Sequence, residues 1–330
     1  MTPARRSFIR FGPAWLFAAG IALAHLAAAQ AQYPVRPVRL IVPYPPGGST
    51  DLLGRTIGER LAEALGQQVV VDNRGGASTM IGAEIAARAP ADGYTLLVAT
   101  VTTLAVNPML YRKLAYDPER DFEPVSMLAT QPYILAVHPS IPATTVPQLI
   151  AYAKSMPNKL TSASAGYATG TYLAGEMFMY LAGVRFTQVP YKGTGPAITD
   201  LLGGHVSMTF SGVTSVRPHV LSGKLRALAV TTARRSAAAP EIPTIAEMGV
   251  AGYETNTWNS LVVPRGTPPA IVARLNREVN AGLNRADVRD RLREQGADPD
   301  PGTPEQLRKH VRAETERFGK LIKAVGLKVQ

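Results

Sequence analysis

Short apolar runs alternate with amphipathic stretches along most of the chain. The apolar run from Val38 to Val42 is followed, from Asp51 to Leu65, by hydrophobic side chains at helical spacing. Further strands are expected at 69–71, 95–99, 133–138, 159–164, 186–189, 206–210 and 225–230, and further helices at 78–88, 146–155, 170–182 and 196–202. Strands and helices that alternate in this way predict an α/β protein with parallel sheets, in which ligands bind at the carboxyl ends of the strands.

The alternation occurs in two series, which predicts two lobes. Gly- or Pro-containing stretches near residues 131 and 254 are candidates for the crossings between them, and each precedes an extended run. A chain that crosses twice leaves 134–254 as one lobe and joins 32–133 to 255–330 in the other. The end of the chain is expected to be helical at 268–284, 287–294 and 303–325.

The first 31 residues resemble a secretory signal peptide. A basic start with three arginines is followed by an apolar segment from about residue 11 to residue 26 and by an alanine-rich end. The Ala-x-Ala pattern predicts cleavage after Ala29 or Ala31 and a periplasmic mature protein. An uncleaved anchor is the disfavoured alternative, and both the general secretion route and the twin-arginine route, which "RRSFIR" resembles, stay open.

Composition excludes several classes of protein. The chain has no cysteine, which excludes a disulfide framework, a thiol nucleophile and a lipid-modified cysteine. Cleavage after residue 31 removes three arginines and no acid, so the net charge falls from +11 by three to +8. Because lysine and arginine are scattered, we expect attraction of small anions and no nucleic-acid partner. We also expect a monomer without cofactor or metal.

The stretch "YPPGGSTD" (44–51) is a Gly-rich loop between a strand and a helix, yet it is not a nucleotide site. A P-loop needs a lysine before the hydroxyl residue, and this loop has none. The stretch "KGTGPAI" (192–198) has isoleucine at the third glycine position of a dinucleotide fingerprint. No G-x-S-x-G or H-E-x-x-H motif occurs, so a hydrolase would need a triad dispersed in the sequence, with a base among His138, His205, His219 and His310.

Five uncharged loops rich in hydroxyl groups and glycine follow predicted strands. They are "PPGGSTD", "ATVTT" (99–103), "SASAGYATGT" (162–171), "PYKGTGPA" (190–197) and "FSGVTS" (210–215). The free N–H groups at a helix N-terminus bind a carboxylate without arginine. One such loop is explained by simple N-capping, whereas five together favour a ligand pocket.

Several longer stretches resemble the tripartite tricarboxylate transporter substrate-binding receptors, the Bug family. They are "YPVRPVRLIVPYPPGGSTD", "GQQVVVDNRGGASTMIGAEIAARAPADGYTLLVAT", "LAYDPERDFEPVSMLA", "VPYKGTGPAITDLLGGHVSMTF" and "GKLRALAVTTARRS". The resemblance extends from about Tyr33 to the C-terminus. It implies a two-lobed periplasmic binding protein of type II with two crossovers, which closes on a small carboxylate, delivers it to integral-membrane permease subunits and catalyses no reaction.

The loops and the resemblance together assign ligand-binding residues. They are Tyr44, Gly47, Gly48, Ser49, Thr50, Thr100, Thr102, Ser164, Ala165, Gly166, Thr169, Thr171, Lys192 and Ser211. The resemblance adds Pro45 to the first loop and implies that this loop holds a ligand carboxylate partly through ordered water. We expect Asp51 to brace the loop, because a bare carboxylate would repel an acid, and Lys192 to stand at the rim.

Departures from the family pattern bear on specificity. Ala168 stands where the family has glycine and Tyr172 where it has histidine, and Val101 and Leu104 stand where polar residues are common. We expect these four residues to favour an acid with an apolar or aromatic body over a tricarboxylate. The rival functions are the exported hydrolase with a dispersed Ser/His/Asp triad and a receptor that signals to a membrane sensor without transport.

Overall fold

The computed structural model describes residues 33–236 and 238–327, so the expected signal peptide and both of its cleavage positions lie outside the described residues. The elements before the first crossing are β1 (Val38–Val42), α2 (Ser49–Leu65), β2 (Val69–Asn73), η1 (Ala77–Thr79), α3 (Met80–Ala87), β3 (Thr95–Thr100), η2 (Thr102–Val106), α4 (Asn107–Leu110) and α5 (Pro118–Asp121). None of the described helices is long and apolar enough to span a bilayer.

The long strand β4 (Phe122–Val137) leads into the middle of the chain. The elements there are α6 (Val146–Ser155), β5 (Thr161–Ser164), α7 (Gly170–Ala182), β6 (Thr187–Pro190), α8 (Thr194–Leu202), β7 (Met208–Gly212), α9 (Val213–Leu221) and β8 (Arg226–Val230). The chain returns along β9 (Asn256–Pro264) to α10 (Pro269–Asn284), α11 (Ala286–Glu294), β10 (Asp298–Pro299) and α12 (Pro304–Val325).

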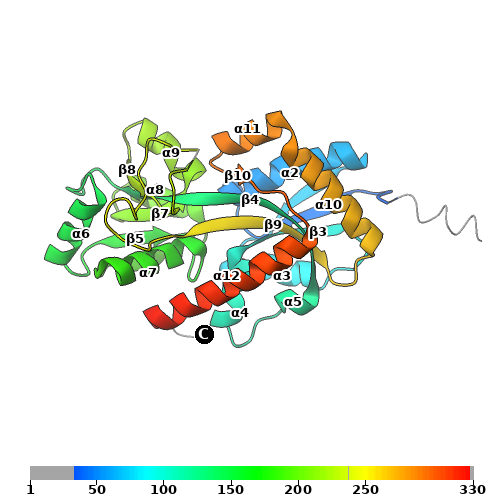
Figure 1. Ribbon diagram of the computed structural model, residues 1–330, viewed down its shortest axis with the longest axis horizontal. Helices are drawn as coiled ribbons and strands as arrows, with labels where there is room; N and C mark the ends of the chain where they lie inside the picture. Colours follow the sequence, from blue (N-terminus) through cyan, green and yellow to red (C-terminus); the bar gives the residue numbers. More distant parts are fainter. Residues whose placement is uncertain (1–32, 237, 328–330) are drawn as a thin grey trace, which may run out of the picture.

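The strands follow the order β2-β1-β3-β9-β4-β7-β5-β6, and β10 and β8 also pair with β4. The strands β1, β2 and β3 are parallel to one another, as are β5, β6 and β7. The two α/β lobes are therefore confirmed, and they lie at opposite ends of the molecule, joined by β4 and β9 (Figure 1). The sheet as a whole is mixed, because β9 is antiparallel to both β3 and β4.

The strand β4 changes partners along its length. Residues Phe122–Pro132 pair with β9 in the first lobe, and residues Tyr133–Val137 pair with β7 in the second. The sequence predicts only the end of this strand, from residue 133, because Pro124 and Pro132 resemble strand breakers. Pro124 is accommodated where the β4–β9 register shifts, and Pro132 lies at the end of the pairing. The lobe boundaries at 133/134 and 254/255 stay a prediction.

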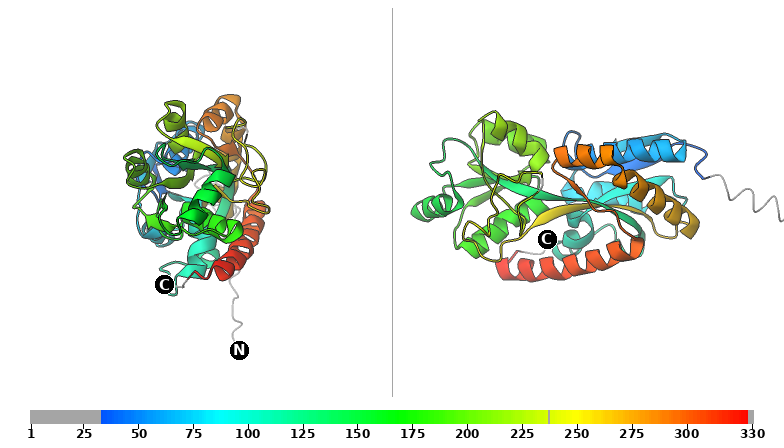
Figure 2. Two further views of the ribbon diagram at one scale, coloured as in Figure 1. Left: turned by 90° about the vertical axis from the view of Figure 1, so that its left-hand side faces the viewer. Right: turned by 45° about the horizontal axis from the view of Figure 1, so that its top comes forward.

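Helices cover both faces of each half of the sheet. In the first lobe, α2, α10 and α11 pack their buried side chains on one face, and α3 and α12 pack theirs on the other. Figure 2 shows α12 along one side of the molecule and α2, α10 and α11 on the opposite side. In the second lobe, α6 and α7 cover one face and α8 and α9 the other. Each sheet is thus buried on both faces, as its apolar strands require.

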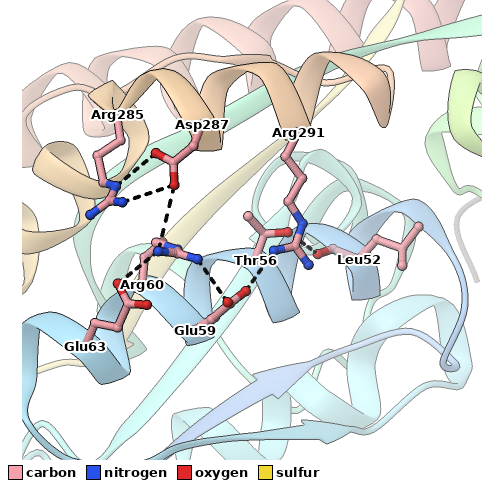
Figure 3. A network of polar contacts seen from close by, with 8 residues as sticks. All are labelled: Leu52, Thr56, Glu59, Arg60, Glu63, Arg285, Asp287 and Arg291. Atoms are coloured by element: carbon pink, nitrogen blue, oxygen red, sulfur yellow. Dashed lines mark hydrogen bonds and ion pairs between the residues drawn. The ribbon is translucent and has the colours of Figure 1, made fainter.

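A polar network fastens α11 to α2 (Figure 3). Arg60 on α2 forms ion pairs with Glu59 and Glu63 at 2.9 Å and lies 3.9 Å from the carboxylate of Asp287 on α11. Arg291 on α11 reaches back to Glu59 at 2.8 Å. The network lies on the helix whose N-terminus enters the cleft between the lobes, so it helps to fix that helix in place.

Candidate functional site

A cavity of about 80 Å³ lies between the two lobes, where the carboxyl ends of their strands meet. None of the residues that line it is charged. They are Tyr44, Pro45, Pro46, Gly48, Ser49, Thr50, Tyr133, Ala165, Thr169, Gly170, Thr171, Thr194, Gly195, Pro196, Gly212 and Thr257. The cavity therefore brings together Tyr44, Gly48, Ser49, Thr50, Ala165, Thr169 and Thr171, seven of the residues that the sequence assigns to the ligand.

Four helices of nine or more residues, α2, α7, α8 and α9, begin at this cavity. The N-cap residues of α2, α8 and α9 are Gly48, Gly193 and Gly212, and none of them caps its helix with a side chain. The first N–H groups of these helices are left without the usual side-chain acceptor. Together with the partial positive charge of four helix N-termini, they form a site suited to a carboxylate.

Two of these glycines permit close contact between the lobes. A Cβ atom built on Gly193 would lie 3.0 Å from Cγ of Pro45, and one built on Gly212 would lie 3.4 Å from Oγ of Ser49. A larger residue at either position would push the second lobe away from the first loop. Glycine at these two positions thus begins a helix and also allows the backbone of the second lobe to lie close to the first loop.

Tyr44 forms part of the cavity wall, and Thr100 and Thr102 support it from behind. Burial raises the pKa of the Tyr44 phenol, and hydrogen bonds with the two threonine side chains lower it in part. Both threonines are 1% exposed, and neither lines the cavity. In this structure their hydroxyl groups therefore orient Tyr44.

Tyr133 and Thr257 are cavity residues that the sequence analysis misses. Burial raises the pKa of the Tyr133 phenol, which also hydrogen-bonds with the side chain of Thr257. A Cβ atom on Gly170 would lie 2.1 Å from the Tyr133 hydroxyl, so only glycine leaves room for this tyrosine. Both residues belong to the stretches expected to cross between the lobes, and polar side chains at such crossings are the signal that could have found them.

Asp51 braces the first loop. Its carboxylate accepts hydrogen bonds from the amide of Gly47 at 2.9 Å, from Arg55 at 3.0 Å and from Asn73 at 3.0 Å. Burial raises the pKa of Asp51, but these hydrogen bonds outweigh it and hold the pKa below its ordinary value. Asn73 also donates to the carbonyl oxygen of Tyr44. The carboxylate therefore stabilises the loop and stays out of the cavity.

The second-lobe loop is organised by its own hydroxyl groups. Thr171 accepts from the amide of Ala165 at 2.9 Å, and Thr169 donates to the carbonyl oxygen of Gly166 at 2.8 Å. Ala168 has a φ of 58°, in the left-handed region that favours glycine. Its methyl group is buried in the core, away from the cavity.

The remaining expected residues lie outside the cavity lining. Lys192 is exposed beside α8, which agrees with a place at the rim. Gly47 and Gly166 lie in loops next to the cavity, and Ser164 and Ser211 lie at the ends of β5 and β7. None of these four residues lines it. Of the four residues expected to set specificity, Val101 and Leu104 are core side chains like Ala168, and Leu104 lines another cavity. The side chain of Tyr172 packs on Tyr167, with ring centroids 5.0 Å apart.

That other cavity, of about 300 Å³, lies beneath α12 and is the larger of the two. Its arginines, Arg265, Arg308 and Arg312, already form ion pairs with Glu123 or Glu119. The cavity between the lobes is lined by no charged side chain, so no acidic residue neutralises the positive ends of the four helices that meet there. We therefore identify it as the candidate ligand site. None of the four histidines considered for a triad lines it.

Comparisons with known proteins agree with this fold. Residues 53–327 match the family model described as "Tripartite tricarboxylate transporter family receptor". A structure of an R. palustris protein with adipate is 43% identical, with a TM-score of 0.87, and the match covers 89% of this chain and 98% of that one. The periplasmic binding protein BugD is 34% identical, with a TM-score of 0.85, over 90% of this chain and 100% of its own. MatC from Rhodopseudomonas palustris with bound malate is 34% identical, with a TM-score of 0.83, over 88% and 100%.

These neighbours are solute-binding receptors and not enzymes, which overturns the rival reading as an exported hydrolase. The family match covers more than half of the chain, and the fold agrees along nearly the whole length of each neighbour. The chain belongs to the tripartite tricarboxylate transporter receptor family, as a solute-binding receptor of the Bug type.

Proposed function

We propose that the protein binds a small carboxylic acid in the cavity between its lobes and delivers it to the membrane subunits of a tripartite tricarboxylate-type transporter. The observation that carries this proposal is the convergence of four helix N-termini on a cavity without a charged side chain. Such a site compensates a carboxylate by N–H donors and hydroxyl groups alone. Two similar proteins were solved with adipate and with malate, which are both dicarboxylates.

The cavity walls favour an acid with an apolar body. Tyr44, Tyr133, Pro45, Pro46 and Pro196 line the cavity with rings, which suit an apolar body better than the three carboxylates of citrate. We therefore assign specificity to these rings in place of Leu104, which lines the cavity beneath α12 and not this one. We expect Tyr172 to affect specificity only indirectly, because it packs on Tyr167 of the second-lobe loop and does not line the cavity.

A thermal-shift panel of the mature protein tests the binding proposal. Mono-, di- and tricarboxylates, aromatic acids and amino acids are compared, each acid beside its uncharged amide, for example adipate beside adipamide. We expect at least one short acid to raise the melting temperature, since a ligand at about 100 times its Kd adds roughly 2.7 kcal/mol of stability. We expect its amide to have no effect. Equal shifts for acid and amide, or a preference for citrate, would contradict the proposal.

Delivery to a permease needs a test in cells. We expect deletion of the gene to abolish uptake of the identified acid by the native host, and the wild-type chain to restore it. The mature protein is expected in the periplasmic fraction, beginning at residue 30 or 32, and as a monomer by light scattering. Uptake that is unchanged by the deletion would indicate a receptor that signals without transport.

A further inference from the structure

Ser78, in η1 of the first lobe, is bonded across the cleft to the ligand loop of the second lobe. Its hydroxyl group donates a hydrogen bond of 2.6 Å to the carbonyl oxygen of Tyr167, which lies in the second-lobe loop before α7. A Cβ atom built on Gly166 would lie 4.0 Å from Oγ of Ser78, so the two segments are in contact. Ser78 does not line the cavity, and its bond therefore links lobe to lobe and not lobe to ligand.

The backbone around Ser78 is held in an unfavourable conformation. Ala77, Ser78 and Thr79 have φ values of 46°, 49° and 74°, which place three consecutive residues with side chains in the left-handed region. Residues other than glycine seldom adopt this region even singly, so the surroundings must hold the segment in place. Such segments gather at binding loops and switch regions.

Buried hydrogen bonds from η2 and α4 hold this segment. Asn107, which is fully buried, donates to the carbonyl oxygen of Ser78 at 2.8 Å. Thr103, also fully buried, donates to the hydroxyl group of Thr79 at 3.0 Å. Tyr116 fixes the other side of the network, because it accepts from Asn107 at 3.1 Å and donates to the carbonyl oxygen of Thr103 at 2.7 Å.

The same network reaches the wall of the ligand cavity. The hydroxyl groups of Thr103 and Thr100 are 3.3 Å apart, and Thr100 and Thr102 hydrogen-bond with the phenol of Tyr44. The π-helical turn of η2 presents Thr102 and Thr103 to this network in succession. A continuous set of hydroxyl groups thus connects Tyr44, which faces the ligand site, to the segment that carries Ser78.

We propose that Ser78 is a positioning residue for closure: its hydroxyl group fastens η1 of the first lobe to the ligand loop of the second lobe and slows release of the bound acid. Thr103 and Asn107 hold Ser78 in the conformation that reaches Tyr167. The proposal rests on the binding function above, because the second-lobe loop that Ser78 fastens lines the carboxylate site.

The kinetic test uses adipate as the probe and compares Ser78→Ala with Ser78→Gly. Both variants lack the hydroxyl group, and only the glycine relieves the backbone strain. We expect both to raise the dissociation rate of adipate about fivefold to tenfold, as for the loss of one hydrogen bond, with little change in association rate. Thr103→Val should raise it by a smaller factor. Ser222→Ala, an exposed serine that donates within its own turn, is the matched control. Unchanged dissociation in both Ser78 variants would overturn the proposal.

An engineered disulfide tests whether Ser78 contacts the second-lobe loop, and this test needs no ligand. The chain has no cysteine, so Ser78→Cys combined with Gly166→Cys introduces the only pair. We expect mild oxidation to cross-link this pair within the folded full chain. We expect no cross-link for Ser222→Cys with Gly166→Cys, because residue 222 follows the end of α9 opposite the cleft. A folded double variant that resists cross-linking would overturn the proposed contact. If no acid binds the wild-type protein, the proposed function fails while this experiment still decides the contact.

Discussion

At the scale of single residues, a substitution of Gly48 should affect ligand binding without affecting folding. Its φ of −82° is ordinary, and a Cβ atom built on it meets no atom closer than 4.0 Å. We expect a side chain here to block the approach of the backbone to the ligand, although the fold itself has room for one. We expect Gly48→Val to keep its melting temperature and to lose adipate affinity by at least about tenfold, because the side chain enters the small cavity.

Gly170 provides the contrast for that experiment. Alanine at this position would place Cβ 2.1 Å from the hydroxyl group of Tyr133, so Gly170→Ala should lower both stability, by roughly 1–3 kcal/mol, and affinity. Calorimetry and thermal unfolding of the two variants measure both effects. A Gly48→Val protein that binds normally would mean that the ligand lies elsewhere.

Asp51 makes the stability of the first loop depend on pH. Because its folded pKa lies below the unfolded value of about 3.9, its contribution is present above that value and is lost as the pH falls through the folded pKa. We expect Asp51→Asn to lower the free energy of unfolding by roughly 1–2 kcal/mol between pH 5 and 8, with the difference shrinking below about pH 4. Urea unfolding at each pH measures this.

The matched control is Asp290→Asn, whose carboxylate forms one exposed ion pair with Arg293 at 3.6 Å. This substitution should lower the free energy of unfolding far less than Asp51→Asn at every pH, since exposed ion pairs contribute little to stability. A deficit for Asp51→Asn that stays constant down to pH 3 would show that the carboxylate charge is not what braces the loop.

At the scale of secondary-structure elements, the joint between α2 and α11 depends on Arg60. Its side chain is 17% exposed, contacts three carboxylates and packs against Gly282 of α10. We expect Arg60→Ala to lower stability by roughly 1–2 kcal/mol, partly through the lost packing of its aliphatic stem. Arg88→Ala, which removes a single exposed pair with Glu84, should change stability by less than about 0.5 kcal/mol. If Arg60→Ala and Arg88→Ala lowered stability equally in urea unfolding, the contacts between α2 and α11 would not contribute to stability as we expect.

At the scale of the whole molecule, the electrostatics of binding should be simple. No lining residue carries a charge, and burial raises the pKa values of the two phenols in the wall, so both stay neutral through pH 9. We expect the affinity for adipate to stay within about twofold from pH 6 to 9 and to fall only where the acid itself is protonated. Calorimetry across this range is the measurement. A tenfold change near pH 6.5 would place a histidine at the ligand.

Much of the local structure could be predicted from the sequence. The expected bounds of β1, α6 and α7 are those observed, because their apolar periodicity and capping residues act over a few neighbours. The loops with hydroxyl groups and glycine also lie at the cleft, since loops after parallel strands share one edge of the sheet.

Long-range pairing and side-chain direction were decided only in the folded molecule. Tyr133 and Thr257 enter the cavity because β4 pairs with β9 up to residue 132 and with β7 from residue 133. Both are contacts between segments far apart in the chain. Leu104 is buried in the core of the first lobe and lines the cavity beneath α12, and no period of the sequence predicts this packing. The sequence alone determined which loops could bind an anion. The tertiary structure decided which of their side chains face it, because that depends on how distant segments pack against each other.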